Sequence, residues 1–282
     1  MPAKINIDTA KPRISVIITT YNAPEELWLV LLGYEQQTSR DFEILIADDG
    51  SDERTQQVID RFRSLSSIHV KHVWHEDNGF AKCKILNSAV KQAVSDYLLF
   101  TDGDCIPRAD FVAVHLQEAR PGWFLSGTYN NIPSSFKSLI GEQEVISGEA
   151  FKLSWLRKHG LEFSPKCLRL IKSYSLRLLL NSITTTQPTW NGCNVSGWKS
   201  DVVAVNGYDE RMRYGGLDRE LGLRLNNLGI RGKQIRFKAI CLHVDHERGY
   251  MNEEDLKRNL AIRQATIETK STHTDFGIRR AA

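Results

Sequence analysis

The stretch YLLFTDGDCIP, residues 97–107, places a run of apolar residues directly before two aspartates and ends on a proline. The apolar run is typical of a buried β-strand, and Asp102 and Asp104 bring two carboxylates to its end with one glycine between them. Burying two anionic groups this close together is costly unless a cation or hydrogen-bond donors neutralise them. The stretch therefore predicts a strand end with a neutralising partner.

The residues before this strand alternate between strand and helix patterns. Such an order predicts a parallel sheet with helices on both faces. The expected strands are RISVIITT (13–20), FEILIADDGS (42–51), IHVKHVW (68–74) and YLLFT (97–101), and the expected helices are 21–37, 52–65 and 81–94.

Ligands of such sheets bind beyond the carboxyl ends of the strands. Four strand ends deliver polar or acidic side chains to that edge: Thr19, Thr20, Tyr21 and Asn22, then Asp48 and Asp49, then Glu76 and Asp77, then Asp102 and Asp104. In an extended strand Asp102 and Asp104 point the same way, and hard oxygen ligands suit Mg²⁺ or Mn²⁺, which would also engage a diphosphate. The alternative is that Asp-Gly-Asp is a surface turn.

The composition is that of a globular chain, with 282 residues, 41% of them apolar and 25% charged. The first ten residues lack an apolar signal core, and no apolar run approaches the roughly 18 residues of a membrane span. The five cysteines are scattered and form no CxxC pair, so neither a disulfide framework nor a zinc ribbon is expected. These features favour a cytoplasmic protein.

Positive charge is concentrated between residues 151 and 181, which hold seven Lys or Arg and one acid, whereas the net charge of the whole chain is +3. This segment predicts a local anionic partner rather than a chain that binds nucleic acid. Leu168, Ile171, Leu176, Leu179 and Leu180 recur at roughly helical spacing, flanked by Lys166, Arg169, Lys172 and Arg177. A basic amphipathic helix of this kind can lie on an anionic membrane surface, here the inner face of the cell membrane, or bind a phosphorylated glycolipid acceptor. Alternatively, its apolar stripe packs on the rest of the protein and its charges are solvated.

Five motifs follow one another along the chain: ISVIITTYN, ILIADDGSDE, NGFAKCKILNSAV, YLLFTDGDCIP and NGYDERMRYGGLDRELGLRL. Their order and spacing resemble those of inverting family 2 glycosyltransferases, and the later part resembles the galactosyltransferase-type half of chondroitin-polymerase-like enzymes. The resemblance covers roughly residues 13–130 and 188–250. It implies an α/β protein of the GT-A fold, with a Rossmann-like, mostly parallel sheet, flanking helices and a helical basic insertion.

The same resemblance implies that different segments of the chain have different functions. Residues 1–130 would bind the nucleotide sugar, 131–187 form the insertion, 188–250 bind the acceptor and carry catalysis, and 251–282 form a C-terminal helix and tail. The implied reaction moves a sugar from a nucleotide-diphosphate donor, a UDP-sugar, to a hydroxyl of a glycan or glycolipid with inversion, in cell-surface polysaccharide or lipopolysaccharide synthesis. The implied cofactor is Mn²⁺ or Mg²⁺.

Roles for the strand-end residues also follow from the resemblance. Asp49 would accept from the uracil imide and Tyr21 would offer a stacking face, in agreement with the chemistry of both groups. Asp104 would ligate the metal, together with a histidine from AICLHVDHERGY, which is either His243 or His246. The implied nucleotide-binding residues are Thr19, Tyr21, Asn22, Asp49, Asp77, Lys84 and Asp102. Lys82 and Lys84 open a helix and could reach the diphosphate, or could belong to a solvated helix face.

The motif YGGLDREL supplies Asp218, which by resemblance is the base that activates the acceptor hydroxyl, with Glu220 as the alternative. The family usually has Glu-Asp where this chain has Leu217 and Asp218, so the acceptor contact of that Glu is missing. Asp218 could instead cap a helix over 219–228. The resemblance places Trp190, Asn191, Gly192 and Asn194 beside the donor sugar and acceptor, although Trp190 could equally be a core residue.

Two other functions remain open from the sequence. A nucleotidyltransferase would also pair an α/β nucleotide fold with acidic metal ligands, but TTYNAPEE lacks the Gly-rich basic loop expected after its first strand. An inactive nucleotide-binding or sugar-binding module would not need Asp49, Asp102, Asp104, Asp218 and His243 together.

Overall fold

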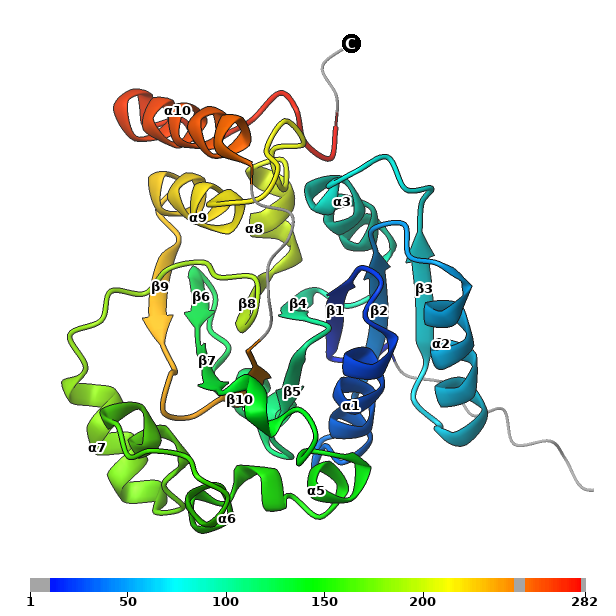
Figure 1. The fold of residues 1–282 in the computed structure, drawn as a ribbon. Coiled ribbons are helices and arrows are strands. Elements are labelled where there is room, and N and C mark those ends of the chain that lie inside the picture. Colours follow the sequence, from blue (N-terminus) through cyan, green and yellow to red (C-terminus); the bar gives the residue numbers. More distant parts are fainter. Residues whose placement is uncertain (1–10, 246–251, 280–282) are drawn as a thin grey trace, which may run out of the picture.

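The computed structural model describes residues 11–245 and 252–279 and contains a seven-stranded sheet in the order β3-β2-β1-β4-β8-β6-β9 (Figure 1). The strands β3, β2, β1 and β4 run parallel, and β8 is antiparallel to β4 and β6. The mostly parallel α/β sheet is therefore confirmed. The strands are β1 (Ile14–Thr20), β2 (Phe42–Asp48), β3 (Val70–Trp74), β4 (Tyr97–Asp102), β6 (Trp123–Ser126), β8 (Val195–Trp198) and β9 (Arg231–Gln234).

Both faces of this sheet are covered, because alternate residues of β1 enter two separate apolar clusters. Ile14, Val16 and Ile18 pack with α1 (Pro24–Glu35) and α2 (Glu53–Leu65). Ile17 packs on the opposite face with α3 (Lys82–Gln92), α8 (Lys199–Ala204) and α9 (Leu217–Asn227). Strands buried on both faces explain the continuous apolar runs in the sequence.

A second, three-stranded sheet in the order β5-β10-β7 extends from the end of β4. It contains β5 (Cys105–Pro107), β10 (Ile240–Val244) and β7 (Thr128–Ile132). Its register pairs Cys105 of β5 with His243 of β10. This pairing brings a late strand next to the Asp-Gly-Asp turn.

The insertion is helical, as expected, but in short pieces that lie along the bottom of the molecule (Figure 1). No single amphipathic helix spans the predicted stripe, because η3 ends at Leu170 and α7 begins at Tyr174. Arg169 is buried, with its Nη1 donating to the Tyr129 carbonyl at 3.0 Å, so it does not flank an exposed stripe. The pieces are η1 (Ser134–Phe136), α5 (Glu142–Ile146), η2 (Glu149–Phe151), α6 (Leu153–Lys158), η3 (Pro165–Leu170) and α7 (Tyr174–Ile183).

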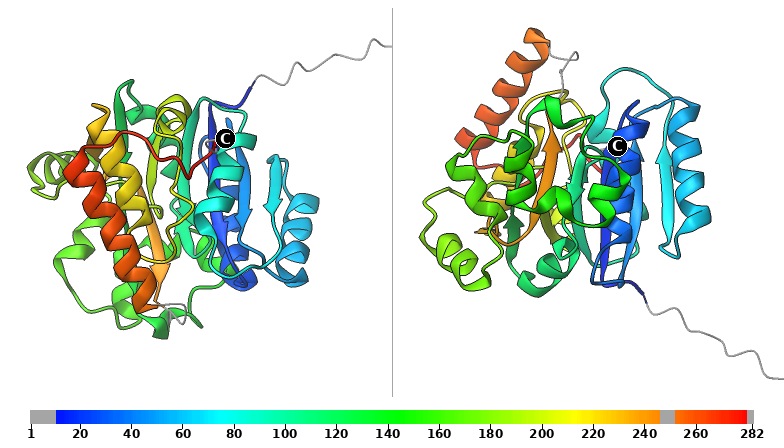
Figure 2. Two further views of the ribbon diagram at one scale, coloured as in Figure 1. Left: turned by 90° about the horizontal axis from the view of Figure 1, so that it is seen from above. Right: turned by 60° about the horizontal axis from the view of Figure 1, so that its bottom comes forward.

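Two further helices complete the fold, α4 (Phe111–Glu118) and α10 (Glu253–Thr269). The predicted C-terminal helix is α10, which packs along α9 (Figures 1 and 2). Its Asn259 donates to the carbonyl oxygens of Arg213, Tyr214 and Gly215 at 2.9 Å each. In this way α10 holds the loop that leads into α9.

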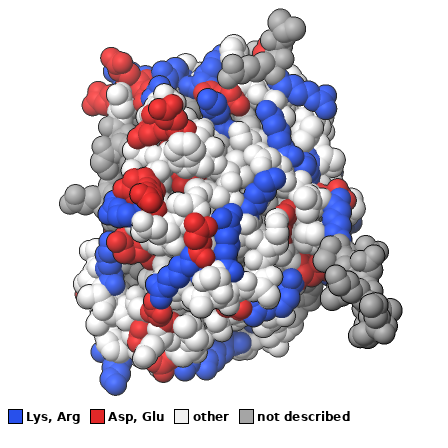
Figure 3. Space-filling view, turned by 90° about the vertical axis from the view of Figure 1, so that its right-hand side faces the viewer, with Lys and Arg blue, Asp and Glu red and all other residues white. Residues whose placement is uncertain are grey.

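All five cysteines are buried and free, in agreement with the absence of a disulfide framework. Among the described residues, no helix is both long and apolar enough to span a bilayer. Basic and acidic side chains are interspersed over the face at the right of Figure 1, so positive charge is not gathered there (Figure 3).

Candidate active site

The acidic strand ends meet where the strand order of the large sheet reverses. From β1 the chain proceeds outward to β2 and β3, whereas β4 lies on the other side of β1. Thr19 and Asp102 are register partners at this point, and Thr19 Oγ1 donates to Asp102 Oδ1 at 2.8 Å. A reversal of this kind opens a crevice at the carboxyl ends of the strands, where ligands of such folds bind.

Asp102, Gly103 and Asp104 form a tight turn between β4 and β5, which corrects the expectation of a continuing extended strand. Gly103 N–H donates to the Thr19 carbonyl oxygen at 2.7 Å, and a Cβ on Gly103 would lie 2.9 Å from that oxygen. Only glycine fits this approach without a shift. The turn still brings the two carboxylates together, because oxygens of Asp102 and Asp104 and the Cys105 Sγ lie within 4.8 Å of one another.

His243 reaches this turn from β10. Its Nε2 lies 3.4 Å from Asp104 Oδ2, and its Nδ1 is 3.0 Å from Asn131 Oδ1, which orients the ring. His246, the other candidate, lies outside the described residues. Two carboxylates and an oriented imidazole are donors that Mn²⁺ accepts, so the residues present fit a divalent metal.

Lys82 supplies positive charge to the same crevice. Its Nζ donates to Asp102 Oδ1 at 2.6 Å. Burial alone would lower the pKa of Lys82, but the carboxylates of Asp102 and Asp218 outweigh burial and hold that pKa above its ordinary value. Lys84 is exposed, two residues further along α3, where the helix turns it away from Lys82. The lysine beside the acidic cluster is therefore Lys82, not Lys84.

Asp49 and Tyr21 lie at the ends of β2 and β1. His75 Nε2 is 2.8 Å from Asp49 Oδ1, and Ala81 N–H donates to Asp49 Oδ2 at 2.9 Å. Burial raises the pKa of Asp49, against the opposing effects of Ala81 and His75. Tyr21 is 49% exposed and its hydroxyl donates to Asp77 Oδ2 at 2.9 Å, which leaves a ring face open to a ligand.

Asn22 and Asp48 hold the loops that frame this part of the site. Asn22 has a positive φ of 47° and accepts from Asp52 N–H at 2.9 Å, whereas α1 is capped at Ala23 without a side-chain bond. Asp48 is fully buried and accepts from Ser51 N–H at 2.8 Å. Both side chains are therefore engaged in loop structure.

Asp218 is the second residue of α9, and the helix cap is Gly216, so Asp218 does not cap the helix. A Cβ on Gly192 would lie 2.7 Å from Asp218 Oδ1, which shows how closely the loop passes the carboxylate. Burial raises the pKa of Asp218 to about 6, with Lys82 opposing and Asp102 adding to the rise. A carboxylate with this pKa is ionised at neutral pH yet basic enough to accept a proton.

Glu220, the alternative base, lies two residues after Asp218 and therefore on a different side of α9. It is buried and accepts from Arg224 at 2.8 Å and 2.7 Å and from Thr266 Oγ1 at 3.0 Å. A carboxylate so occupied holds α9 to α10, and the geometry favours Asp218 as the base.

The structure corrects two of the four expected sugar-contacting residues. Trp190 is 1% exposed, with its Nε1 donating to the Tyr208 hydroxyl at 3.0 Å and its ring against Phe100 and Phe124. Asn194 is fully buried and donates to backbone carbonyls, including that of Thr128 at 3.0 Å. Neither can present its side chain to a sugar. Asn191 donates to the Gly127 carbonyl at 2.8 Å and, with Gly192, lines the loop beside Asp218.

Residues 15–143 match the family model described as glycosyl transferase family 2. The chain is 26% identical to the glycosyltransferase YfnE of Bacillus subtilis over 88% of this chain and 69% of that protein. It is also 26% identical to the chondroitin synthase of Escherichia coli, over 86% of this chain and 36% of that protein. The alignment with the synthase thus spans about a third of its length.

Solved structures share the fold at low sequence identity. TarS of S. aureus, residues 1–349 in complex with UDP-GlcNAc, superposes with a TM-score of 0.61 at 16% identity, over 90% of this chain and 66% of that one. The mannosyltransferase PcManGT of Pyrobaculum calidifontis, in complex with GDP-Man and Mn²⁺, superposes with a TM-score of 0.58 at 19% identity, over 86% of this chain and 59% of that one. These neighbours establish the GT-A fold.

Proposed function

We propose that the chain is a family 2 glycosyltransferase, because residues 15–143 match that family's model, and that it transfers a sugar from a UDP-sugar to a hydroxyl of a glycan or glycolipid with inversion. The observation that carries the proposal is the convergence of Asp102, Asp104, His243, Lys82 and Asp218 on one crevice. Four of them are contributed by separate elements, β4, β10, α3 and α9.

The donor would lie across the ends of β1, β2 and β4. Tyr21 offers its exposed ring to the base, and Asp49 has lone pairs left to accept from an imide N–H, since each carboxylate oxygen accepts more than one bond. Asp77 and Thr19 frame the same edge. In this proposal residues 1–130 bind the donor, and residues 188–250 bind the acceptor.

Asp102, Asp104 and His243 would hold a divalent metal, Mn²⁺ or Mg²⁺. When bound, the metal supplies positive charge to the diphosphate leaving group. Lys82 contributes in the same sense from the protein, because it remains charged beside Asp102. Asn131 fixes the orientation of the His243 ring.

Asp218 is the general base of the proposed reaction. It accepts the proton of the acceptor hydroxyl while the hydroxyl oxygen bonds to the anomeric carbon from the face opposite the diphosphate. The bond between that carbon and the diphosphate oxygen breaks, and UDP leaves with its electron pair. The close passage of Gly192 at Asp218 restricts where an acceptor sugar can lie.

The acceptor side of the proposal rests on chemistry and on the relatives. Chondroitin synthase and the poly(ribitol-phosphate) N-acetylglucosaminyltransferase TarS are among the similar proteins, so a cell-surface polysaccharide or glycolipid is the proposed acceptor class. Such acceptors are built at a membrane. We therefore include a peripheral position on an anionic membrane surface, through the basic insertion, in the proposal.

A donor-hydrolysis screen tests the proposed reaction. UDP release is measured from a panel of nucleotide sugars with and without Mn²⁺, for the unaltered protein and for Asp104→Ala. We expect one or a few UDP-sugars to respond, Mn²⁺ to be required, and Asp104→Ala to lose both the response and Mn²⁺-dependent UDP binding in calorimetry. Unchanged UDP binding by Asp104→Ala would contradict the proposed metal site. If the unaltered protein released UDP from none of the nucleotide sugars and did not bind UDP, the proposed function would be wrong.

A further inference from the structure

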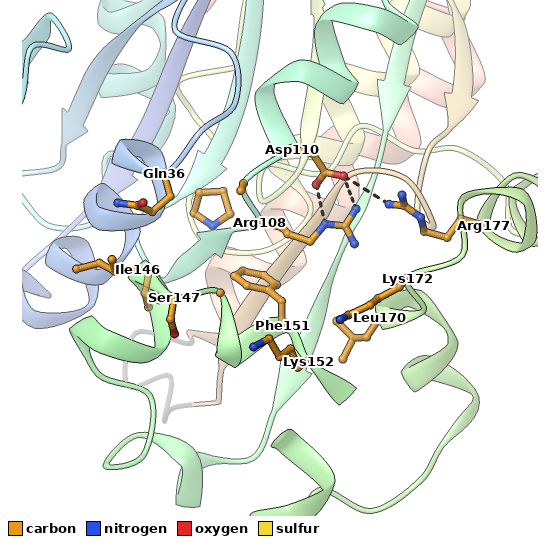
Figure 4. A pocket seen from close by; sticks show the side chains of 14 residues that line it. Gln36, Arg108, Asp110, Ile146, Ser147, Phe151, Lys152, Leu170, Lys172 and Arg177 are labelled. Carbon is orange, nitrogen blue, oxygen red and sulfur yellow. Dashed lines mark hydrogen bonds and ion pairs between the residues drawn. The ribbon is translucent and has the colours of Figure 1, made fainter. Parts of the chain in front are cut away.

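A cavity of about 390 Å³ lies away from the active site, between the end of α1, the loop after β5 and the helices of the insertion (Figure 4). It borders Gln36, which follows the last residue of α1, whereas Asp104 shares a different cavity with Glu25 and Glu26 in the first turn of that helix. A helix of 12 residues is about 18 Å long, so the two cavities lie at opposite ends of α1. This cavity is therefore no part of the donor site.

Its polar lining is strongly cationic. Arg108, Lys152, Lys172 and Arg177 line the cavity together with one acid, Asp110. Asp110 is already paired with Arg108 through two bonds, of 2.6 Å and 2.7 Å. Lys152 Nζ also lies 3.6 Å from Oε1 of Glu149, which is not part of the lining. Four cations thus face two acids, and an excess of positive charge remains.

Arg177 leaves hydrogen-bonding capacity unused. Its Nη1 is 3.5 Å from Asp110 Oδ2, and its Nε is buried without a hydrogen-bond partner among the described residues. A buried N–H donor without a partner is costly, and an anion in the cavity would satisfy it. In Figure 4 the side chain of Arg177 points toward Asp110 and the cavity.

Apart from Gln36 and Ser147, the other side chains of the lining are apolar. Pro107, Val145, Phe151 and Leu170 face the cavity, and Ile146 at its edge is 48% exposed. Cationic groups beside apolar walls match a ligand that joins an anionic group to an apolar one. A small inorganic anion would leave these walls in contact with water.

The helix that contributes Arg177, α7, also places apolar side chains on the outer surface. Three apolar side chains of α7 are more than half exposed: Tyr174 by 58%, Leu179 by 55% and Ile183 by 62%. No residue of this helix is buried. Such side chains in water suit an apolar layer instead. The same helix thus presents a cation inward and apolar side chains outward.

We propose that this cavity binds the phosphate of an anionic membrane lipid while the exposed side chains of α7 enter the acyl layer beside it. The inference deepens the membrane contact of the proposed function, by assigning it to one cavity and one helix. It does not depend on the donor chemistry, so the two are tested by different measurements.

Co-sedimentation with vesicles tests this site. The protein is mixed with vesicles of phosphatidylcholine alone or with phosphatidylglycerol added, and Lys152→Gln/Lys172→Gln is compared with Lys158→Gln/Lys166→Gln. The control pair removes the same charge from exposed positions of the insertion that do not line the cavity. We expect phosphatidylglycerol-dependent binding that falls at least tenfold in the cavity pair and less than threefold in the control pair.

If vesicle binding fell equally in the two double variants, general charge attraction would explain it, and the cavity would not be the binding site. Leu179→Ser/Ile183→Ser should also weaken vesicle binding, and unaltered binding would exclude α7. Calorimetry with glycerol 3-phosphate separates a free phosphate ester from a lipid: binding of the soluble ester without vesicle binding would overturn the membrane assignment. UDP release in solution by the Lys152→Gln/Lys172→Gln variant should remain unchanged, which separates this test from that of the proposed reaction.

Discussion

At the scale of single residues, Asp218 has the acidity that the proposed reaction requires. Because its pKa is raised to about 6, we expect transfer to fall as the pH drops below about 6, about tenfold per unit. Asp218→Asn should lower transfer by about 10² to 10⁴ and leave UDP affinity nearly unchanged. Initial rates over a pH series and calorimetry with UDP check both statements. Transfer at the normal rate by Asp218→Asn would assign the base elsewhere.

Lys82 and its neighbour Lys84 form a matched pair on α3. Lys82 Nζ is bound to Asp102, whereas Lys84 is exposed. We expect Lys82→Met to weaken UDP binding at least tenfold, because it leaves the carboxylate of Asp102 without its cation and removes a positive charge from the diphosphate site. Lys84→Met should stay within twofold of the unaltered protein. Equal effects of the two substitutions in calorimetry would contradict the position given to Lys82.

The residues of the site were predictable to different degrees. Asp102 and Asp104 lie together at the end of β4, where the local strand pattern predicts them. The approach of His243 to Asp104 depends instead on the pairing of β10 with β5, which no local pattern specifies. Trp190 was ambiguous, because an aromatic residue in a loop sequence can be buried by distant strands. His75, which touches Asp49, follows a strand without any motif of its own, so only the three-dimensional arrangement identifies it.

At the scale of elements, the position of Asp218 depends on how α9 packs. Gly222 of α9 lies against Trp190, where an added Cβ would be 2.7 Å from the Trp190 Cβ and 3.1 Å from its backbone nitrogen. We expect Gly222→Ala to displace α9 and to destabilise the fold by about 1–3 kcal/mol, despite the better helix propensity of alanine. Transfer should fall more than UDP affinity, since Asp218 moves with the helix.

Asn226→Ala provides the control on the same helix, because Asn226 is exposed and its substitution changes helix propensity without a close contact. Thermal unfolding of the two variants measures the difference. If Gly222→Ala were as stable as Asn226→Ala, the close approach to Trp190 would not be limiting.

The strands and helices up to β4 were predicted from their apolar patterns, whereas β5, α4, β6 and β7, which follow directly, were not. A local start signal is present in one of the predicted helices. Asp52 caps α2 by accepting from Arg54 N–H at 3.1 Å. The insertion was predicted as helical, yet its breaks were missed. One signal was present: Ser173 caps α7 and thereby separates it from the apolar residues before it.

At the scale of the whole molecule, the early and late parts of the chain build one site together. The donor edge comes from β1 to β4, and His243 and Asp218 come from β10 and α9. The pairing of β8, β6 and β9 joins strands far apart in the chain, and no local pattern specifies such partners. The sheet order beyond β4 therefore required the structure.

The free energy of unfolding should depend on pH through the titration of Asp218. Its pKa rises from an ordinary 3.8 to about 6 on folding, so the folded state holds this proton more tightly than the unfolded state. Its contribution to stability is therefore fully present below about pH 4 and is lost as the pH rises through about 6.

Asp218→Asn removes this titration, while Lys82 keeps Asp102 as its partner. We expect the variant to melt about 2–4 °C above the unaltered protein near pH 8 without divalent metal, and the difference to vanish near pH 4. Asp96→Asn, at an 80% exposed side chain, should stay within about 0.5 kcal/mol at both pH values. A gain in melting temperature that is the same at both pH values, or a loss near pH 8, would show that the Asp218 carboxylate is not destabilised by its surroundings.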